Sequence, residues 1–473
     1  MKNVTRRSFV VAASATTLAA LAGCSSSGSS SSSTSASSSK TVDNDLVTMT
    51  WDDILAEAKG QKVTFLAWGA GGADAYVQMC WEQLTKDVKE KFDIELECVE
   101  YSTAEYQKLT TDTENGGEPT YDMFWFTGST IAPIRNIDGL FGNQWVKSLP
   151  NNEYLDYDNP YITFDGTADT DAMEAPFQGC NPSLVYSQDL WSADIAWNET
   201  NGSVKGLPHN FTELASWVKE NPGKFSYMDL TGQGSFHGLL FAKAILSELT
   251  DDGNGGWKTV YDEADDKATR RKKIQAHIDE WYKWSNSSEA TEEAFAQKAA
   301  YVWAYLNELA PNLLQGDSGA LYIATAPEMM QYVKAGDLAC SFTTCTSVST
   351  RVEASPDSYM SNPAIYMLDT SVGYWDYNVI TKNSPAKAAV MVICNYMIDP
   401  DFQCYAFDTT GNGYNISVDK LPSDKKKALE ETIQKMGKLS PSTDEIENNS
   451  YVDKYGKITA WLASSWNTNV NNA

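Results

Sequence analysis

Hydrophobic positions follow two alternating spacings through the first part of the folded chain. Short apolar runs at residues 62–68, 93–101 and 121–126 have the composition and spacing of β-strands. Between them, residues 73–92 and 106–112 repeat apolar side chains every three or four positions, as an amphipathic helix does. This order of strand, helix, strand, helix and strand predicts a parallel, doubly wound α/β sheet.

A second region of strands and helices follows an extended stretch at residues 175–186, which carries two prolines and is a candidate crossover between lobes. Asn210 with Glu213 three residues later forms a capping box that predicts the start of a helix. The elements expected in this part are helices at 211–220, 232–249 and 327–335, a mostly helical stretch at 251–318, strands at 337–344 and 371–381, and helices at 384–396, from 399 and from 420. Roughly 430 folded residues exceed a single core, so two or three lobes are expected.

The amino terminus has the pattern of an export signal with a lipid attachment site. Arg6-Arg7 followed by Phe9 matches a twin-arginine signal, and a short apolar stretch leads to Leu-Ala-Gly-Cys24, which matches a lipobox. Residues 1–23 are therefore predicted to be removed and Cys24 to carry diacylglycerol and a further acyl chain such as palmitate. Residues 24–40 are almost all serine and form a predicted flexible tether. A transmembrane anchor is the alternative, but the apolar stretch is shorter than the ~20 residues that a bilayer needs.

The charge of the chain limits the partners it can bind. The formal net charge is −27, which repels nucleic acid and anionic lipid. After the signal only four arginines remain, at positions 135, 270, 271 and 351, so an arginine clamp for a polyanion is hard to assemble. A neutral or cationic ligand is favoured, although an acidic surface also simply keeps an exported protein soluble.

The histidines, cysteines and serines of the sequence show no motif typical of a metal site, a bound cofactor or a catalytic centre. The three histidines are far apart in the sequence, and no Gly-x-Ser-x-Gly motif occurs. Seven cysteines remain after Cys24, and local disulfides between Cys340 and Cys345 or between Cys394 and Cys404 are open alternatives. A pair of glycosidase-type carboxylates stays compatible with the 63 acidic residues, so a glycan hydrolase is the rival function.

Two loops at predicted strand ends are candidate ligand sites. In open α/β sheets the ligand lies beyond the carboxyl ends of the strands, where loops lead into helix N-termini. The loops at residues 68–73 and 126–130 each combine an aromatic side chain with glycine and with N–H groups expected to be free at a helix start. The first loop lacks the last glycine of a dinucleotide-binding motif, so phosphate binding is not favoured. Tight turns are the alternative reason for these glycines.

Several segments, in their order along the chain, resemble the extracellular solute-binding proteins of bacterial ABC importers, and most of all the YnjB-like branch. They are the lipobox, residues 62–72, residues 122–128, Trp217-Val-Lys-Glu-Asn-Pro-Gly-Lys-Phe-Ser-Tyr227, residues 234–236, residues 378–390 and Asp399-Pro-Asp-Phe-Gln403. The resemblance implies a two-lobed, type II periplasmic-binding-protein-like clamp with doubly wound sheets and hinge crossovers. One lobe would comprise residues 41–180 and about 375–400, the other residues 181–374, and residues 401–473 would pack on a lobe as a helical segment.

The resemblance also implies a function, a location and a set of contacts. The protein would be a monomeric, lipid-anchored receptor on the outer face of the cell membrane, passing a small polar solute to the permease of an ABC transporter. A scaffold lipoprotein without a small ligand is a further alternative. The candidate contacts are Trp68, Gly69, Gly71, Gly72, Trp125, Thr127, Gly128 and Ser129 on the first lobe, Tyr227, Ser235 and Phe236 on the second, and Gln178, Trp375, Asp376 and Tyr377 at the crossovers. Asp376 between two aromatic residues suits an ammonium or thiazolium-like cation, and a solvated hinge carboxylate is its alternative role.

Overall fold

The secondary structure follows the predicted alternation of strands and helices in most places. The computed structural model describes residues 46–72, 74–127, 134, 137–142, 144–157, 173–180, 182–187, 207–232, 235–344, 363–436, 441 and 443–471. The strands are β1 Lys62–Ala67, β2 Glu95–Glu100, β3 Met123–Thr127, β4 Ala175–Cys180, β5 Pro182–Ser187, β6 Phe225–Ser226, β7 Leu249–Asp251, β8 Trp257–Thr259, β9 Gln315–Gly316, β10 Gly319–Ala320, β11 Cys340–Thr344, β12 Pro363–Tyr366, β13 Ser371–Ile380, β14 Gly413–Tyr414 and β15 Ser450–Val452.

The helices occupy the segments between these strands and most of the carboxyl-terminal region. The α-helices are α2 Trp51–Ala58, α3 Ala75–Phe92, α4 Thr103–Asn115, α7 Phe211–Glu220, α8 Ser235–Glu248, α9 Lys267–Ser285, α10 Glu292–Lys298, α11 Ala300–Leu309, α12 Ala326–Ala335, α14 Lys387–Met397, α15 Pro400–Thr410, α16 Ser423–Met436, α17 Thr443–Asn449 and α18 Gly456–Trp466. Short 3₁₀ turns are η2 Trp145–Ser148, η3 Pro150–Tyr154, η4 Ala310–Asn312 and η7 Val418–Lys420, and η9 Asn467–Asn471 is a π turn. None of the helices in the described ranges is long and apolar enough to cross a membrane.

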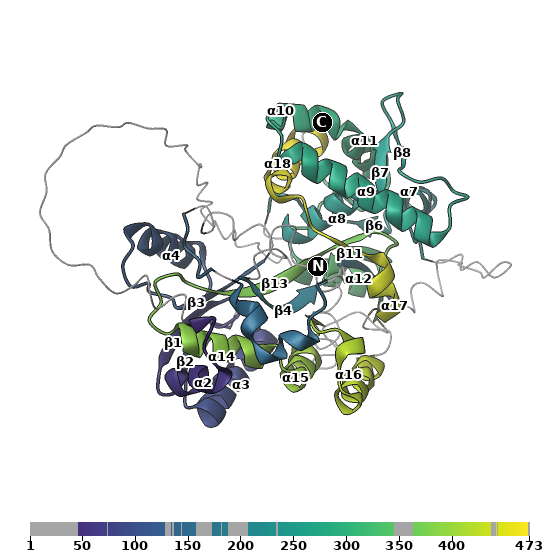
Figure 1. Ribbon diagram of the computed structural model, residues 1–473. Coiled ribbons are helices and arrows are strands. Elements are labelled where there is room, and N and C mark those ends of the chain that lie inside the picture. The colour runs from purple at the N-terminus through teal and green to yellow at the C-terminus, as the bar shows by residue number, and fades with distance from the viewer. Residues whose placement is uncertain are drawn as a thin grey trace, which may run out of the picture. The chain divides into compact units, whose positions relative to one another are not determined.

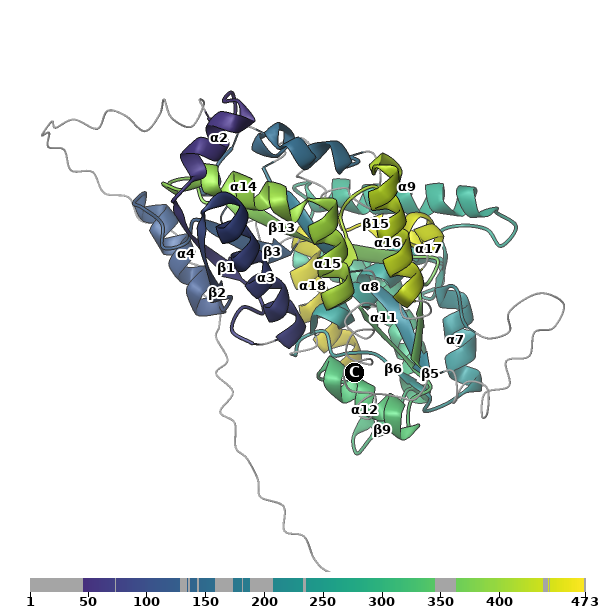
Figure 2. The ribbon, with the colours of Figure 1, turned by 90° about the horizontal axis from the view of Figure 1, so that it is seen from below.

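The larger sheet contains the predicted parallel core. Its strands run in the order β14-β4-β13-β3-β1-β2, with β15 pairing to β13. Strands β1, β2 and β3 are parallel, and β13 is antiparallel to both β3 and β4. Helices α3, α14 and α15 pack against one another beside this sheet, as Figure 2 shows. The carboxyl ends of β1, β2 and β3 therefore meet along one edge of the sheet.

The second sheet is smaller and mostly antiparallel. Its order is β12-β5-β11-β6, in which β5 pairs antiparallel to both neighbours and β6 runs parallel to β11. Helix α8 packs against β11 and against helix α9. In Figure 1, helices α9, α10, α11 and α18 gather around this part of the chain.

The chain passes between the two sheets at two crossovers that lie beside each other. Strand β4 of the first sheet ends at Cys180, and β5 of the second begins at Pro182. The return path leads from β12 in the second sheet to β13 in the first, the long strand at the centre of Figure 1. The Ser371 hydroxyl donates to the Pro182 carbonyl at 2.8 Å, which joins the two crossovers directly.

Two large hydrophobic cores correspond to the two sheets. The first core takes buried side chains from residues 46–177 and from residues 367–446. The second takes them from residues 184–372 and again from residues 451–470, including the fully buried Trp466. The carboxyl-terminal region thus contributes to both cores, because α15 and α16 join the first and α18 joins the second.

Several element predictions are wrong in detail. Helix α14 begins at Lys387 instead of Ser384, since the Ser384 hydroxyl donates to Asp122 at 2.7 Å and accepts from the Ala386 N–H, holding the preceding loop. The stretch 251–318 is mostly helical, as predicted, with α9, α10 and α11, but it also contains β8, which pairs with β7, and the short strand β9. Cys394 and Cys404 are both free, and so is Cys340, so neither suggested local disulfide is present.

Candidate functional site

Two tryptophans meet at the carboxyl edge of the parallel strands. Trp68 directly follows β1, and Trp125 lies on β3, its parallel neighbour. The two indole rings stack with their centroids 6.1 Å apart and their planes inclined by 26°. Both side chains are half-buried, so each keeps part of its surface exposed to solvent. The expectation that these two aromatics lie at the same edge is therefore met in the structure.

Two tyrosines that the sequence analysis missed extend this group. Tyr101 follows β2 and places its ring edge-on to Trp125 at 6.0 Å, and Tyr106 of α4 lies 6.0 Å from Tyr101. We call Trp68, Tyr101, Tyr106 and Trp125 the aromatic cluster. Tyr101 directly follows β2, which is parallel to β1, so the rule that selected Trp68 at the end of β1 would also have selected Tyr101.

The glycine loop after Trp68 does not offer free N–H groups, contrary to expectation. The Gly69 N–H donates to the Glu100 carboxylate at 3.0 Å, and the Gly71 N–H donates to the other oxygen of the same carboxylate. At the start of α3, Asp74 caps the N–H groups of Tyr76 and Val77. Because carboxylates already occupy these donors, the loop is unsuited to an anionic ligand.

Close packing explains two of the glycines in this loop. Gly69 has a φ of +80°, and a Cβ there would lie 2.7 Å from Val77 Cγ1. A Cβ at Gly71 would lie 2.9 Å from Cβ of Glu100. Gly72 also has a positive φ, of +90°. These glycines thus serve a tight turn, which is the alternative role that the sequence analysis gave them. Their contact with a ligand stays a prediction.

A row of polar residues crosses four strands beside the aromatic cluster. Asp376 of β13 pairs in register with Thr127 of β3 on one side and with Gln178 of β4 on the other, and Gln178 pairs with Tyr414 of β14. The Gln178 Nε2 atom donates to Asp376 Oδ2 at 3.0 Å. The register shifts between Asp376 and Tyr377, where β4 carries a bulge. Two candidate residues that are 198 positions apart are therefore in direct contact.

Asp376 is a buried carboxyl and not the solvated hinge carboxylate that the sequence left as an alternative. Its exposed fraction is 4%, and that of Gln178 is 3%. Burial raises the pKa of Asp376 to about 8, against the opposing effect of hydrogen bonding by Gln178 and the Trp125 side chain. Among the described residues, no hydrogen bond of standard geometry reaches Asp376 Oδ1 or Gln178 Oε1. The Trp125 side chain is close enough to the carboxyl to favour its ionised form.

Trp375 and Tyr377, on either side of Asp376, are core side chains in this conformation. Tyr377 is fully buried and stacks on Phe126, with ring centroids 5.4 Å apart. Trp375 is 2% exposed and covers Gly179, where a Cβ would lie 1.8 Å from a carbon of the indole ring. Both side chains hold the sheet together around Asp376, and their contact with a ligand stays a prediction.

The candidates of the second lobe are divided between core and surface. Tyr227 has no exposed surface and accepts a hydrogen bond from the Trp466 indole at 3.1 Å. Ser235 and Phe236 begin α8, which packs against β13, the strand that carries Asp376. Burial lowers the pKa of the adjacent His237 to about 4, so this imidazole is neutral. Gly128, Ser129 and Cys24 lie outside the described residues.

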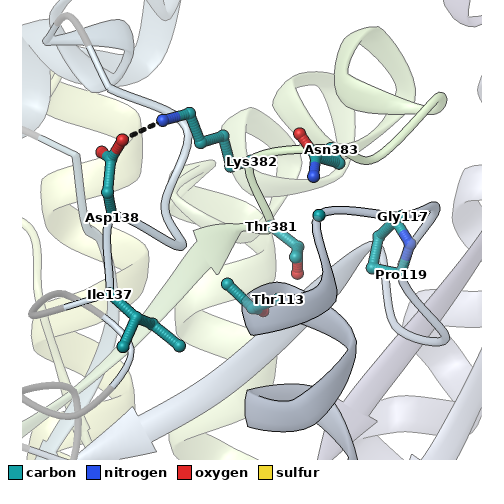
Figure 3. A pocket seen from close by; sticks show the side chains of 9 residues that line it. Thr113, Gly117, Pro119, Ile137, Asp138, Thr381, Lys382 and Asn383 are labelled. Atoms are coloured by element: carbon teal, nitrogen blue, oxygen red, sulfur yellow. Dashed lines mark hydrogen bonds and ion pairs between the residues drawn. The ribbon is translucent and has the colours of Figure 1, made fainter. Parts of the chain in front are cut away.

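A separate cavity of about 250 Å³ lies at the other end of β3 (Figure 3). Its lining includes Thr113, Thr381 and the ion pair of Lys382 with Asp138. The Thr113 and Thr381 hydroxyls donate to the backbone carbonyls of Leu109 and Tyr121. None of the described residues that line this cavity is aromatic, and its two threonine hydroxyls already donate to backbone carbonyls, so it is a weaker candidate than the aromatic cluster.

Among the described residues, no group of three or more histidine, cysteine or acidic side chains could hold a metal ion. The arrangement at the carboxyl edge therefore consists of stacked aromatic faces, buried acceptor oxygens and occupied backbone donors. Such a set can hold a small molecule by stacking and by hydrogen bonds that the molecule donates.

Comparison with known proteins identifies the kind of protein that shares this architecture. A family model described as bacterial extracellular solute-binding protein matches residues 83–430. Protein YnjB of Escherichia coli (strain K12) is 24% identical over 386 residues, which cover 80% of this chain and 86% of that protein.

Two solved structures share the fold. The spermidine/putrescine ABC transporter substrate-binding protein PotD of Streptococcus pneumoniae aligns with a TM-score of 0.52 and 16% identity, over 86% of this chain and 99% of that one. The bacterial solute receptor AcbH, described as preferring β-D-galactopyranose, aligns with a TM-score of 0.53 and 12% identity, over 90% of this chain and 99% of that one.

Proposed function

This chain belongs to the family of bacterial extracellular solute-binding proteins, and from that membership we propose that it is a lipid-anchored receptor which delivers a small polar solute, neutral or cationic, to an ABC import permease. The observation that carries the proposal is the aromatic cluster at the carboxyl edge of β1–β3, next to the buried pair of Asp376 and Gln178. Aromatic faces can stack on a sugar or attract a cation, with about 0.5–2 kcal/mol for each good contact.

The polarity of the site supports a neutral or cationic solute. Glu100 occupies the Gly69 and Gly71 amides, which would otherwise be the natural anion-binding groups at this edge. The net charge of −27 acts in the same direction, because it attracts cations and repels anions at long range. The two fold relatives named for spermidine or putrescine and for β-D-galactopyranose illustrate both ligand classes without selecting one.

The two crossovers support a clamp that closes on the solute. We propose that one lobe comprises residues 41–180 and about 375–400, that residues 181–374 form the other, and that residues 401–473 pack on these lobes. The β4–β5 and β12–β13 connections lie side by side, as a hinge requires. A solute that contacts both lobes would favour the closed state by its difference in affinity for the two states.

The lipid anchor rests on the lipobox at Leu21-Ala-Gly-Cys24 and on the serine-rich tether that follows. We expect the expressed full chain to partition into the detergent phase of Triton X-114 and to incorporate labelled palmitate. Cys24→Ser should abolish both, because the acyl-accepting thiol is missing. Label incorporation that persists in Cys24→Ser would contradict the anchor at this residue while leaving the receptor function untouched.

The receptor function is tested by identifying and rebinding the solute. Mass spectrometry of the small molecules released on denaturation gives candidates, and each is titrated into stripped protein while the thermal unfolding midpoint is followed. A saturable rise in the midpoint with one solute, which is recovered unchanged, is the expected result. Trp68→Ala and Trp125→Ala should each weaken binding by at least about tenfold.

The matched control is Trp257→Ala, which removes a half-buried tryptophan of β8 that packs on Tyr305 in the second core. It should leave the affinity unchanged. Equal affinities in wild type, Trp68→Ala and Trp125→Ala would refute the aromatic cluster as the binding site. Hydrolysis of a glycan that is abolished by a single carboxylate substitution would instead establish the rival function, a tethered glycan hydrolase.

A further inference from the structure

Two buried oxygen atoms beside the aromatic cluster, Asp376 Oδ1 and Gln178 Oε1, accept no hydrogen bond of standard geometry from the described residues. We propose that Asp376 and Gln178 form a subsite for the protonated nitrogen of the solute, so that the solute is an organic cation and its binding displaces a proton from Asp376. This inference rests on the proposed receptor function and narrows its solute class. It assigns Asp376 as the residue that determines the charge of the solute.

The geometry places several oxygen atoms without a donor from the described residues close to the ionisable carboxyl of Asp376. Gln178 uses its Nε2 atom to hold Asp376 Oδ2 at 3.0 Å, which fixes both side chains and leaves Gln178 Oε1 and Asp376 Oδ1 without a hydrogen bond of standard geometry from the described residues. Asn378 Oδ1, two positions along β13, is also buried without such a partner. Gln178 Oε1 and Asn378 Oδ1 are acceptors, and Asp376 Oδ1 is an acceptor once the carboxyl has lost its proton. A buried acceptor without a donor costs about 1–3 kcal/mol, so a group carrying several N–H bonds is the best complement.

The charge of Asp376 favours a cationic group of the ligand over an uncharged hydroxyl at this subsite. A buried carboxylate is strongly unfavourable unless a positive charge lies beside it. Three described residues lie beside Asp376: Thr127 and Gln178 are in register with it, and the Trp125 side chain is close enough to affect its pKa. None of the three carries a positive charge. A protonated amine or a cationic heterocycle with N–H groups supplies both the donor and the missing charge, whereas a sugar hydroxyl supplies only the donor.

The half-buried aromatic faces suit the same solute. Trp68 stacks on Trp125, whose side chain reaches Asp376, and Tyr101 meets Trp125 edge-on. Aromatic faces next to a carboxyl stabilise a cation together, the rings by their quadrupoles and the carboxylate by its charge. The Gly69 and Gly71 N–H groups already donate to Glu100, so their positive ends do not repel a cation bound at this edge.

Proton displacement follows from the burial of the carboxyl. Burial raises the pKa of Asp376 to about 8, and no charged group of the described residues contributes to this shift. With this pKa, an empty site would hold a proton at pH 7. A bound cation favours the carboxylate and lowers this pKa, so up to one proton leaves for each solute bound. Below pH 8 the affinity then rises with pH, by at most about tenfold per unit, and it levels off above pH 8.

The test is isothermal titration calorimetry at pH 7 in two buffers of different ionisation enthalpy, phosphate and Tris. Stripped wild-type protein is titrated with the organic cations putrescine, spermidine and thiamine, with the uncharged sugars galactose and maltose, and with the solute that co-purifies. We expect a cation to bind and to release between half a proton and one proton, about the amount that a pKa near 8 allows at pH 7. Asp376→Asn should weaken its binding by at least about tenfold and abolish the proton release.

Two further variants keep the test decisive if Asp376→Asn folds poorly. Gln178→Leu removes the amide and should weaken cation binding by about threefold to tenfold while proton release persists. Glu248→Gln is the matched control, because Glu248 is also a fully buried acid but belongs to the second core. It should keep the wild-type affinity and proton release.

The failures of the two proposals are distinguishable. Binding of a sugar without any cation, or binding of a cation to Asp376→Asn with unchanged affinity and proton release, overturns the cation subsite and leaves the receptor function standing. If no probe binds and no solute co-purifies, the receptor function itself is contradicted, and the subsite with it.

Discussion

A single glycine makes room for the side chain that borders Asp376. A Cβ at Gly179 would lie 1.8 Å and 1.9 Å from two carbons of the Trp375 ring, so any larger residue displaces this buried indole. Gly179→Ala is therefore expected to lower the free energy of unfolding by about 2 kcal/mol or more, measured by denaturant unfolding. Gly117→Ala is the control, since nothing lies within 4 Å of its Cβ position, and it should change stability by less than about 0.5 kcal/mol. Equal stabilities of the two variants would show that Trp375 moves aside freely.

Glu248 provides a test of burial that is independent of the ligand. Burial raises the pKa of this carboxyl to about 7, while its Oε1 atom accepts from the Phe211 N–H at 2.9 Å and from the Tyr261 hydroxyl at 3.2 Å. The folded protein therefore holds a proton that the unfolded chain loses above its ordinary glutamate pKa, and stability falls as pH rises from about 4.5 to about 7.

Glu248→Gln keeps both hydrogen bonds to the Oε1 atom and removes the buried charge. The variant should be more stable than wild type by about 3 kcal/mol above pH 7, with the difference vanishing below pH 4.5. Thermal unfolding at a series of pH values measures it. A constant difference at every pH would mean that the pKa of Glu248 is the same in the folded and the unfolded chain, so that burial does not shift it.

At the scale of elements, the loop between β1 and α3 is shaped by a carboxylate from the next strand. Glu100 at the end of β2 accepts the Gly69 and Gly71 N–H groups, and these charge-assisted bonds fix the loop that carries Trp68. Glu100→Ala should lower the free energy of unfolding by about 1–3 kcal/mol and weaken solute binding, as Trp68 loses its fixed position.

The control for this prediction is Glu97→Ala on the same strand. Glu97 is exposed and forms an ion pair with Lys62 at 2.7 Å, a kind of contact that contributes at most about 1 kcal/mol. Its loss should leave solute affinity unchanged. If Glu100→Ala binds the solute as tightly as Glu97→Ala does, the loop is not part of the site.

The elements with strong local signals could be predicted from the sequence, and those set by distant contacts could not. The parallel β1-β2-β3 core and the Asn210 cap of α7 were predictable, because periodicity and capping are local properties. The start of α14 was not, since Ser384 is bound by Asp122, which lies 262 positions away.

The same reasoning applies to the site. Trp68 and Trp125 could be selected as strand-end aromatics, and Tyr101 could have been found by the same rule. The engaged amides of Gly69 and Gly71 could not be predicted, because their acceptor comes from another strand. The burial of Asp376 was also beyond prediction, since it depends on strands that are distant in sequence joining around β13.

At the scale of the whole molecule, the two cores are connected by the β4–β5 and β12–β13 crossovers and by the passage of the chain from α16 to α18. Ser371 is hydrogen-bonded to Pro182 between the two crossovers. The proposed clamp predicts that the radius of gyration, measured by small-angle X-ray scattering, falls when saturating solute is added. The double variant Trp68→Ala and Trp125→Ala at the same solute concentration should show no decrease. A radius that stays constant while the solute is bound would contradict closure as the response to binding.

The central claim is that this chain holds a small polar solute without transforming it. The most direct measurement is mass spectrometry of the small molecules bound to natively purified protein, followed by titration of the recovered compound into stripped protein. The account predicts one organic cation that rebinds saturably at one molecule per chain and is recovered chemically unchanged. Conversion of that compound by the protein, or purification of folded protein that neither carries nor binds any small molecule, would contradict it.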